Sequence, residues 1–229
     1  AKIQARGNII IGVKNNLRPL GFVSSEGKLQ GLEIDIAKKL AEEILGKPEA
    51  VVFKPLTNTK RLQSVIDEQV DLSIGQVTVT KSRSRIVRFS LTYYTDSTNI
   101  ISRNKKFNQL SDFKKGTLLV LNNSYTVALI KAELPQAKLI GVDSYEAAWQ
   151  SLEAGEADGF VGDKTVLVGW RQEYPQYHLI PFNYSAFPLA IVMPKGLQYK
   201  DLHEKVDQAI AKWLKTGWLQ ARIKYWGLD

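Results

Sequence analysis

Continuous runs of apolar residues alternate along the chain with stretches in which apolar residues recur every three or four positions. The runs predict buried strands, and the periodic stretches predict amphipathic helices. Strands are expected over residues 8–13, 50–56, 71–80, 116–122, 137–142, 157–163 and 186–195. Helices are expected over residues 34–45, 59–70, 126–134, 144–156 and from Leu202 onward. This alternation predicts an α/β fold with largely parallel sheets.

Local signals predict where some of these elements begin. Asp35 and Ser144 are each placed to cap a helix, because short polar side chains accept hydrogen bonds from the free amides of the first turn. Residues 25–27, Ser-Glu-Gly, predict a hairpin turn. The last helix is expected to bury an apolar stripe made of Val206, Ile210, Trp213 and Leu214.

One pattern occurs twice. SVIDEQVDLSIG and SLEAGEADGFVG each combine a helix, a short acidic linker and a strand. Two similar βα units predict two lobes of related build. In open α/β sheets, ligands bind at the carboxyl ends of strands beside helix N-termini, so candidate site residues are sought there.

The composition narrows the class of protein. A chain of 229 residues with 44% hydrophobic residues suits one large domain or two lobes of about 100 residues each. No apolar run approaches the length of a membrane span. The chain starts AKIQARGNIIIGV, without a charged-then-apolar leader, so a signal peptide is expected to be either absent or already removed. The lack of cysteine excludes disulfides and thiolate metal sites.

The net charge of +8, from 31 basic and 23 acidic residues, raises the question of nucleic-acid binding. The cations are interleaved with acids, as in EGKLQGLEIDIAKKLAEE, and no groove-reading motif accompanies them, so nucleic acid is not expected as a partner. GxSxG, GxGxxG, P-loop and HExxH motifs are missing. His178 and His203 lack metal-ligand spacing and are expected at the surface. We therefore expect no catalytic residue, no metal and no cofactor.

From Gly31 the chain continues GLEIDIAKKLAEEI, and later segments contain TVTKSR, FSLTYY and FVGDKTVLVGW. This ordered set resembles the bacterial extracellular solute-binding proteins of the polar amino acid class (family 3), including their glutamate- and aspartate-binding members. The resemblance implies a two-lobe periplasmic-binding-protein fold, with a mostly parallel sheet flanked by helices in each lobe. Lobe 1 would comprise residues 1–95 and 188–229, and lobe 2 residues 96–187.

The same resemblance implies two extended hinge crossovers, TYYTDST and YSAFPLA, and a cleft that closes on one amino acid. It also implies a monomer outside the cytoplasmic membrane that delivers its ligand to the permease of an ABC importer. No direct insertion into the membrane is expected.

An amino acid presents a carboxylate and an ammonium, so its receptor needs a fixed cation and a fixed anion. Arg83 is the candidate for the carboxylate, since a guanidinium can donate two parallel hydrogen bonds. In the family, the arginine of a TxTxxxR pattern makes this contact, and Thr78, Thr80 and Arg83 match that pattern. Asp163 is the candidate for the ammonium; an N-cap role is the alternative, and the two roles are compatible.

Further polar residues lie close to these two along the chain. Gln76 and Thr78 are expected to offer oxygen atoms to the ammonium. Asn122, Ser124 and Thr126 precede or begin the helix after strand 116–122, where free amides favour an anion; ordinary helix capping is the alternative.

Two more cations bear on the ligand's side chain. Lys14 follows the first strand, where relatives for neutral or cationic amino acids often carry an acid. Arg61 begins a helix, where relatives selecting glutamate or aspartate carry a similar arginine. With Arg83 and Asp163 matching the zwitterion, these cations would be surplus unless the ligand is acidic. The alternative is that both point to solvent or pair with Glu33 or Asp35.

We therefore expect an acidic amino acid, glutamate or aspartate, as the ligand. Some positions depart from the family: Leu17 and Arg18 replace a common aromatic, and Ser124-Tyr125 replaces a frequent Gly-Thr pair. A receptor for glutamine or another polar or basic amino acid is the alternative. The ligand-sensing domain of a larger receptor and a cyclohexadienyl-dehydratase-like enzyme also remain open.

Overall fold

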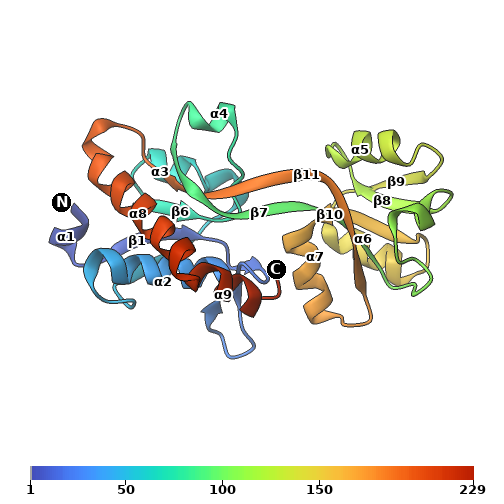
Figure 1. Ribbon diagram of the computed structural model, residues 1–229, viewed down its shortest axis with the longest axis horizontal. Helices are drawn as coiled ribbons and strands as arrows, with labels where there is room; N and C mark the ends of the chain where they lie inside the picture. The colour runs from blue at the N-terminus through green and yellow to red at the C-terminus, as the bar shows by residue number, and fades with distance from the viewer. Residues whose placement is uncertain (1) are drawn as a thin grey trace. The chain divides into compact units, whose positions relative to one another are not determined.

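The computed structural model describes residues 2–229, apart from the side chains of residues 183 and 184 (Figure 1). The chain divides into two compact units. Unit 1 comprises Ala1–Thr95 and Phe187–Asp229, and unit 2 comprises Asp96–Ala186.

Two long strands belong to both units. Strand β7 covers Arg88–Ser102 and strand β11 covers His178–Met193, so each continues through a boundary between the units. The two segments expected as extended crossovers, residues 92–98 and 184–190, lie within these strands.

The sheet of unit 1 has the strand order β5-β1-β6-β11. Strand β1 (Ile9–Val13) runs parallel to β5 (Val51–Pro55) on one side and to β6 (Leu72–Ile74) on the other. Strand β11 is antiparallel to β6, with Val192 opposite Ser73. A separate small sheet contains β2 (Asn16–Leu17), β3 (Gly21–Val23) and β4 (Leu29–Gln30).

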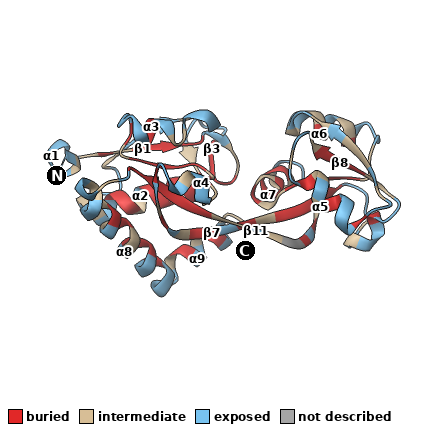
Figure 2. Cartoon of the chain, turned by 90° about the horizontal axis from the view of Figure 1, so that it is seen from above, coloured by how far each residue is buried: buried red, intermediate tan, exposed pale blue. Residues whose placement is uncertain are grey.

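The helical elements of unit 1 are α1 (Lys2–Arg6), α2 (Leu32–Leu45), η1 (Asn58–Lys60), α3 (Gln63–Ile66), α4 (Lys81–Ser84), η3 (Leu197–Tyr199), α8 (Lys200–Thr216) and α9 (Trp218–Tyr225). Helix α2 lies beside α8 and α9 (Figure 1). Buried and exposed residues alternate along α8 (Figure 2). Its buried side carries Val206, Ile210 and Trp213, as the apolar spacing predicts.

The sheet of unit 2 continues in the order β7-β10-β8-β9. Its remaining elements are η2 (Leu110–Phe113), β8 (Thr117–Leu121), α5 (Thr126–Glu133), β9 (Lys138–Val142), α6 (Tyr145–Glu153), β10 (Gly159–Asp163) and α7 (Lys164–Glu173). Strand β8 runs parallel to both of its neighbours, β10 and β9, whereas β10 is antiparallel to β7.

Strand periodicity gives unit 2 a core on each face of its sheet. Leu118 packs into one core with Ile130 of α5, and the next residue, Leu119, packs into the other with Leu152 of α6 and Leu167 of α7. Successive strand residues point to opposite faces, so continuous apolar runs are what a strand covered on both sides requires.

The first long helix begins earlier than predicted, at Leu32, and Asp35 does not cap it. The N-cap is Gly31 with φ of 134°, where an added Cβ would lie 2.2 Å from the carbonyl oxygen of Leu20. Only glycine fits this backbone. The Asp35 carboxylate instead accepts hydrogen bonds from Trp226 Nε1 at 2.7 Å and Arg222 Nη1 at 3.4 Å.

The helix expected over residues 59–70 is limited to η1 and the single turn α3. The chain leaves helical geometry at Glu68, whose φ is 58°, and the amides of Gln69 and Val70 both donate back to the carbonyl of Ser64. This left-handed turn ends the helix.

Three further expectations are wrong. The strand predicted over residues 71–80 ends at Ile74, because Gln76 has φ of 54° and only Thr78 pairs again, with Leu189. Leu214 is 56% exposed, on the outer side of α8. His203 is not a surface residue, since it is 7% exposed and its Nε2 bonds the carbonyl of Pro194. His178 is half-buried, and its Nε2 bonds the carbonyl of Phe107.

Candidate functional site

Three cations of unit 1 lie around the carboxyl ends of β1 and β6. These strands are parallel, so their carboxyl ends share one edge of the sheet. Lys14 follows β1 directly, is only 8% exposed, and donates from Nζ to Asn58 Oδ1 at 2.9 Å. Arg61 and Lys14 both flank Gly75, where an added Cβ would lie 3.4 Å from Arg61 Cδ and 3.4 Å from Lys14 Cγ.

Arg61 is anchored by backbone carbonyls. Its Nη1 donates to the carbonyls of Gly75 and Gln76, each at 2.8 Å, and its Nε donates to that of Asn58 at 3.2 Å. These bonds fix the guanidinium. Among the described residues, no hydrogen bond engages its Nη2, which keeps two N–H groups for another acceptor.

Arg83 lies in α4, the single turn that Thr80 caps by accepting the Arg83 amide at 3.1 Å. Its Nη1 donates to the carbonyl of Thr78 at 2.8 Å, and the side chain is half-buried. The neighbouring cations Lys81, Arg85 and Arg88 are exposed. One arginine of this basic segment is therefore oriented toward the strand ends, and the others lie at the surface.

Lys14, Arg61 and Arg83 form what we call the cationic cluster. Burial lowers the pKa of Arg61, and the charge of Arg83 lowers it further. Burial and then the charge of Arg61 lower the pKa of Lys14. The carboxylate of Glu33 acts in the opposite direction on both. The three cations thus repel one another, and one acid compensates them in part.

Other carboxylates of unit 1 do not balance this charge. Asp35 is committed to Arg222 and Trp226. Over the part of the chain that the structure describes, no ion pair joins a member of the cationic cluster to a carboxylate. Lys14 is buried, so water does not compensate its charge either. Three cations minus the one charge of Glu33 leave an excess of two positive charges.

In unit 2, Asp163 ends β10 and occupies the N-cap position of α7, but its side chain makes no capping hydrogen bond. Asp96, on β7, caps this helix instead. Its Oδ1 accepts from the Thr165 amide at 3.1 Å, and its Oδ2 accepts from Thr165 Oγ1 at 2.7 Å. The carboxylate of Asp163 is therefore not consumed by the helix.

Burial raises the pKa of Asp163 to about 6, with a further contribution from the charge of Asp96 and an opposing one from Tyr125. The Tyr125 hydroxyl donates to Asp163 Oδ1 at 3.4 Å and lies 2.7 Å from Thr98 Oγ1. Two carboxylates in a partly buried place repel each other, and a bound cation relieves that repulsion. Asp96 and Asp163 form what we call the acidic pair.

The start of α5 holds two of the predicted residues. Thr126 is 2% exposed, its amide donates to Ser124 Oγ at 3.1 Å, and the two hydroxyl oxygens lie 2.9 Å apart. Asn122 is turned elsewhere: its Nδ2 donates to Asp143 Oδ1 at 2.7 Å. Tyr125, between Ser124 and Thr126, is the residue that links this helix start to Asp163.

Sequence reasoning missed Asp96 and Tyr125 as parts of these clusters. Glu33 was one of the two acids considered as partners of Lys14 and Arg61, and its charge does act on both. Asp96 had no local signal, because its partner Thr165 lies 69 positions away. Arg18, whose direction the sequence left open, stacks its guanidinium over Phe22 at 4.8 Å.

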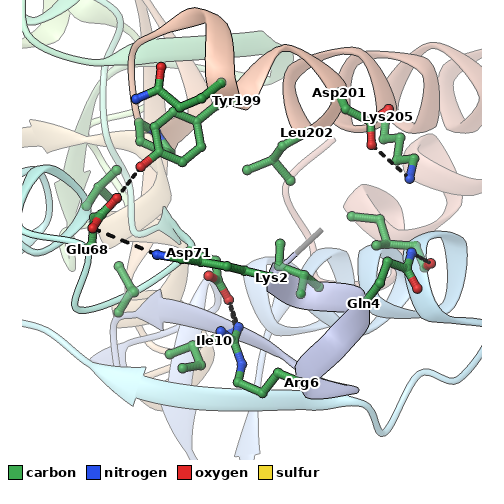
Figure 3. Close-up of a pocket in the computed structure, with 16 residues that line it drawn as sticks. Lys2, Gln4, Arg6, Ile10, Glu68, Asp71, Tyr199, Asp201, Leu202 and Lys205 are labelled. Atoms are coloured by element: carbon green, nitrogen blue, oxygen red, sulfur yellow. Dashed lines mark hydrogen bonds and ion pairs between the residues drawn. The ribbon is translucent and has the colours of Figure 1, made fainter.

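A cavity of about 390 Å³ lies at the opposite, amino ends of β1 and β6 in unit 1 (Figure 3). Its charged groups pair with one another: Arg6 with Asp71, Lys205 with Asp201 at 3.1 Å, and Lys2 with Glu68 at 4.0 Å. A charged ligand would have to break one of these pairs. The candidate binding groups are therefore the cationic cluster in unit 1 and the acidic pair in unit 2, rather than this cavity.

The described side chains contain no group of three His, Cys, Asp or Glu residues that could hold a metal ion. No described helix combines the length and the apolar character needed to cross a membrane.

Several known proteins are similar to this chain in sequence. A "Glutamine-binding protein" from Geobacillus stearothermophilus is 32% identical over 83% of this chain and 74% of its own length. The "ABC transporter arginine-binding protein 1" of Escherichia coli is 26% identical over 97% of this chain and 91% of its own length.

Among solved structures, a solute receptor for L-cysteine from Neisseria gonorrhoeae superposes with a TM-score of 0.74, at 30% identity, over 98% of this chain and 91% of its own. The fold is accordingly the two-lobe periplasmic-binding-protein fold. The sequence model of the bacterial extracellular solute-binding proteins, family 3, matches residues 9–229. The chain belongs to that family.

Proposed function

We propose that this protein is the amino-acid receptor of an ABC importer and that its preferred ligand is an acidic amino acid, glutamate or aspartate. The named relatives bind different amino acids, so membership of the family supports the class of ligand but not its side chain. The side chain is argued from the charges of the two clusters. As in the family, we place the receptor outside the cytoplasmic membrane, as a monomer that meets a permease.

The zwitterionic part of the ligand uses one charge from each unit. Arg83 donates to the α-carboxylate, for which its fork of N–H groups is suited. Asp163 accepts from the α-ammonium, whose positive charge relieves the repulsion within the acidic pair. Thr78, Gln76, Ser124 and Thr126 contribute further oxygen atoms or hydroxyls near these two groups.

The observation that supports an acidic side chain is the excess of two positive charges in the cationic cluster. One is matched by the α-carboxylate and the second by a side-chain carboxylate that Lys14 and Arg61 bind. Each charge-assisted hydrogen bond contributes about 1.5–3 kcal/mol. A neutral side chain would leave a partly buried cation without a counter-charge, which costs several kcal/mol.

Glutamine is the second candidate, and two observations favour it. The relative from G. stearothermophilus is named for that ligand. Glu33 also compensates part of the charge of Lys14 and Arg61, so the penalty for a neutral ligand is smaller than three uncompensated cations would impose.

Substitution of Arg61 separates the two candidates. Arg61→Ala should weaken glutamate binding about ten- to 150-fold, which corresponds to the loss of one charge-assisted hydrogen bond, and weaken glutamine binding much less. Isothermal titration calorimetry with glutamate, aspartate and glutamine measures both. Arg85→Ala, at an exposed arginine of the same charge, is the matched control and should change neither affinity.

Equal losses for glutamate and glutamine in Arg61→Ala would remove the acidic specificity and leave the receptor function intact. A wild-type protein that binds no amino acid at all would contradict the receptor function itself.

A further inference from the structure

Glu33 is a fully buried carboxylate in the first turn of α2, and it contacts groups from two other parts of unit 1. Its Oε2 accepts a hydrogen bond from the backbone amide of Gln76 at 2.8 Å. The same oxygen accepts from the hydroxyl of Tyr93 on β7. Because Glu33 is 0% exposed, its carboxylate cannot contact a ligand directly. It can affect ligand binding only through its charge and through the groups to which it is hydrogen-bonded.

The amide that Glu33 holds belongs to the peptide group between Gly75 and Gln76. The carbonyl of that same peptide group accepts from Arg61 Nη1 at 2.8 Å. One peptide unit is thus clamped between an anion at its N–H end and a cation at its C=O end. This is the orientation that its dipole favours, and it couples the position of Arg61 to Glu33.

The clamp also holds an unfavourable backbone conformation. Gln76 has φ of 54°, a left-handed geometry that non-glycine residues adopt at a cost. Its amide is fixed by Glu33 and its own carbonyl by Arg61, at 2.8 Å each. Hydrogen bonds to its amide and to its carbonyl therefore hold Gln76 in this conformation, and the loss of either bond should let the backbone relax.

The negative charge of Glu33 reaches the cationic cluster as well. Its effect on the pKa of both Lys14 and Arg61 is to raise it, against the lowering caused by burial. The same field acts on a bound ligand with the opposite sign: it disfavours a ligand carboxylate beside Lys14 and Arg61.

We propose that Glu33 is a positioning residue that sets the charge selectivity of the site, by orienting Arg61 through the Gly75–Gln76 peptide and by limiting the positive charge that an acidic side chain meets. This inference rests on the proposed function. The two effects of Glu33 have opposite consequences for selectivity, so two substitutions can separate them.

Glu33→Gln removes the charge and keeps an oxygen that can accept from the Gln76 amide. The ratio of glutamate to glutamine affinity should rise about three- to tenfold, because repulsion of the ligand's second carboxylate is lost. Glu33→Asp keeps the charge but is one methylene shorter, so the clamp loosens and Arg61 loses its fixed position. That ratio should fall about three- to tenfold, because Arg61 serves the acidic side chain more than the neutral one.

Tyr93→Phe is the matched control, since it removes a second hydrogen bond to the same oxygen without changing the charge or the clamp. It should lower stability and leave the ratio within twofold of wild type. Titration calorimetry with glutamate and glutamine on each folded variant gives the ratios, and circular dichroism identifies variants that fold.

A ratio that rises in Glu33→Gln and falls in Glu33→Asp supports the proposal. A ratio that is unchanged, or shifts in the opposite direction, in either variant that folds overturns it, whatever happens to the absolute affinities. If wild-type protein binds neither amino acid, the proposed function has failed instead, so the two failures are distinguishable.

Discussion

Asp163 has a carboxyl group whose pKa is about 6, raised first by burial and then by the charge of Asp96. A free aspartate has a pKa near 3.9. In the ligand-free protein this carboxyl group is therefore partly protonated just below neutrality, where the α-ammonium of an amino acid still carries its full charge. The ammonium binds the ionised form, so ligand binding should compete with a proton.

The affinity for glutamate should fall about tenfold between pH 7 and pH 5, because the ionised fraction of a group with pKa about 6 falls by that factor. The charges of glutamate itself hardly change in this range. Calorimetric titrations at several pH values measure the effect. Asp163→Asn should bind more weakly at pH 7 and lose the pH dependence; a variant that keeps the wild-type pH profile would assign the proton to another group.

The same shift has a defined sign for stability. Since the folded pKa lies above the unfolded one, the unfolded chain binds fewer protons between about pH 4 and pH 6, and the contribution of Asp163 to stability falls as pH rises through that window. Asp163→Asn should remove this decrease in urea-unfolding experiments.

At the scale of elements, the start of α7 depends on a residue outside the helix and its loop. Asp96, on β7, accepts from both the amide and the hydroxyl of Thr165, and both residues are almost fully buried. Most helix caps come from the residue next to the helix, as Ser144 does for α6 by accepting the Ala147 amide at 3.0 Å. The cap of α7 instead ties the helix to the strand shared by both units.

Thr165→Val keeps the shape of the side chain and removes the hydroxyl donor, leaving a buried carboxylate oxygen with one bond fewer. Stability should fall by about 1–3 kcal/mol. Urea unfolding followed by tryptophan fluorescence, with Trp149 and Trp170 in unit 2, measures it. Ser144→Ala, which removes an exposed local cap, should cost about 1 kcal/mol. If Thr165→Val costs nothing, Asp96 does not support α7.

The features that were predicted correctly depend on residues that lie close together in the sequence. Ser144 caps α6, the apolar runs of unit 2 form its strands, and the repeated helix-to-strand pattern occurs in both units. Asp35 was wrong as a cap because its partners Arg222 and Trp226 lie 187 and 191 positions away. The helix after residue 59 was too long because a left-handed residue, Glu68, ended it, and such a residue other than glycine gives little warning in sequence.

For the candidate site residues too, local signals were easier to interpret than contacts between residues far apart in the sequence. Asp163 lies at the end of β10, as its position in the sequence predicts, whereas Arg83 lies in α4 and bonds the carbonyl of Thr78. Glu33 and Asp35 were both considered as partners of Lys14 and Arg61, but sequence alone did not separate them: Asp35 bonds Arg222 and Trp226, whereas Glu33 bonds the Gln76 amide, 43 positions away. Sequence spacing predicted which groups are candidates, whereas their balance of charge depends on contacts between residues far apart in the sequence.

At the scale of the molecule, the two units carry opposite charges at their candidate groups. Unit 1 contributes three cations and unit 2 two carboxylates. Relatives with the same fold are named for glutamine, arginine and L-cysteine, so the fold does not determine the side chain that is bound. The charges of the cationic cluster and the acidic pair can determine which side chain is bound, because substitutions can alter these charges without altering the fold.

A thermal-shift screen against the amino acids tests that statement on the whole protein. A ligand at a thousandfold excess over its Kd stabilises the folded state by about 4 kcal/mol, which raises the Tm of a chain of this size by roughly 8–16 °C. At equal concentration the shift should be largest for glutamate or aspartate, which match both excess cations, smaller for glutamine, which matches one, and smallest for arginine, which adds a third. Arg83→Ala should lose the shift with all of them, because every amino acid has an α-carboxylate. A largest shift with arginine would mean that the cationic cluster does not face the ligand side chain.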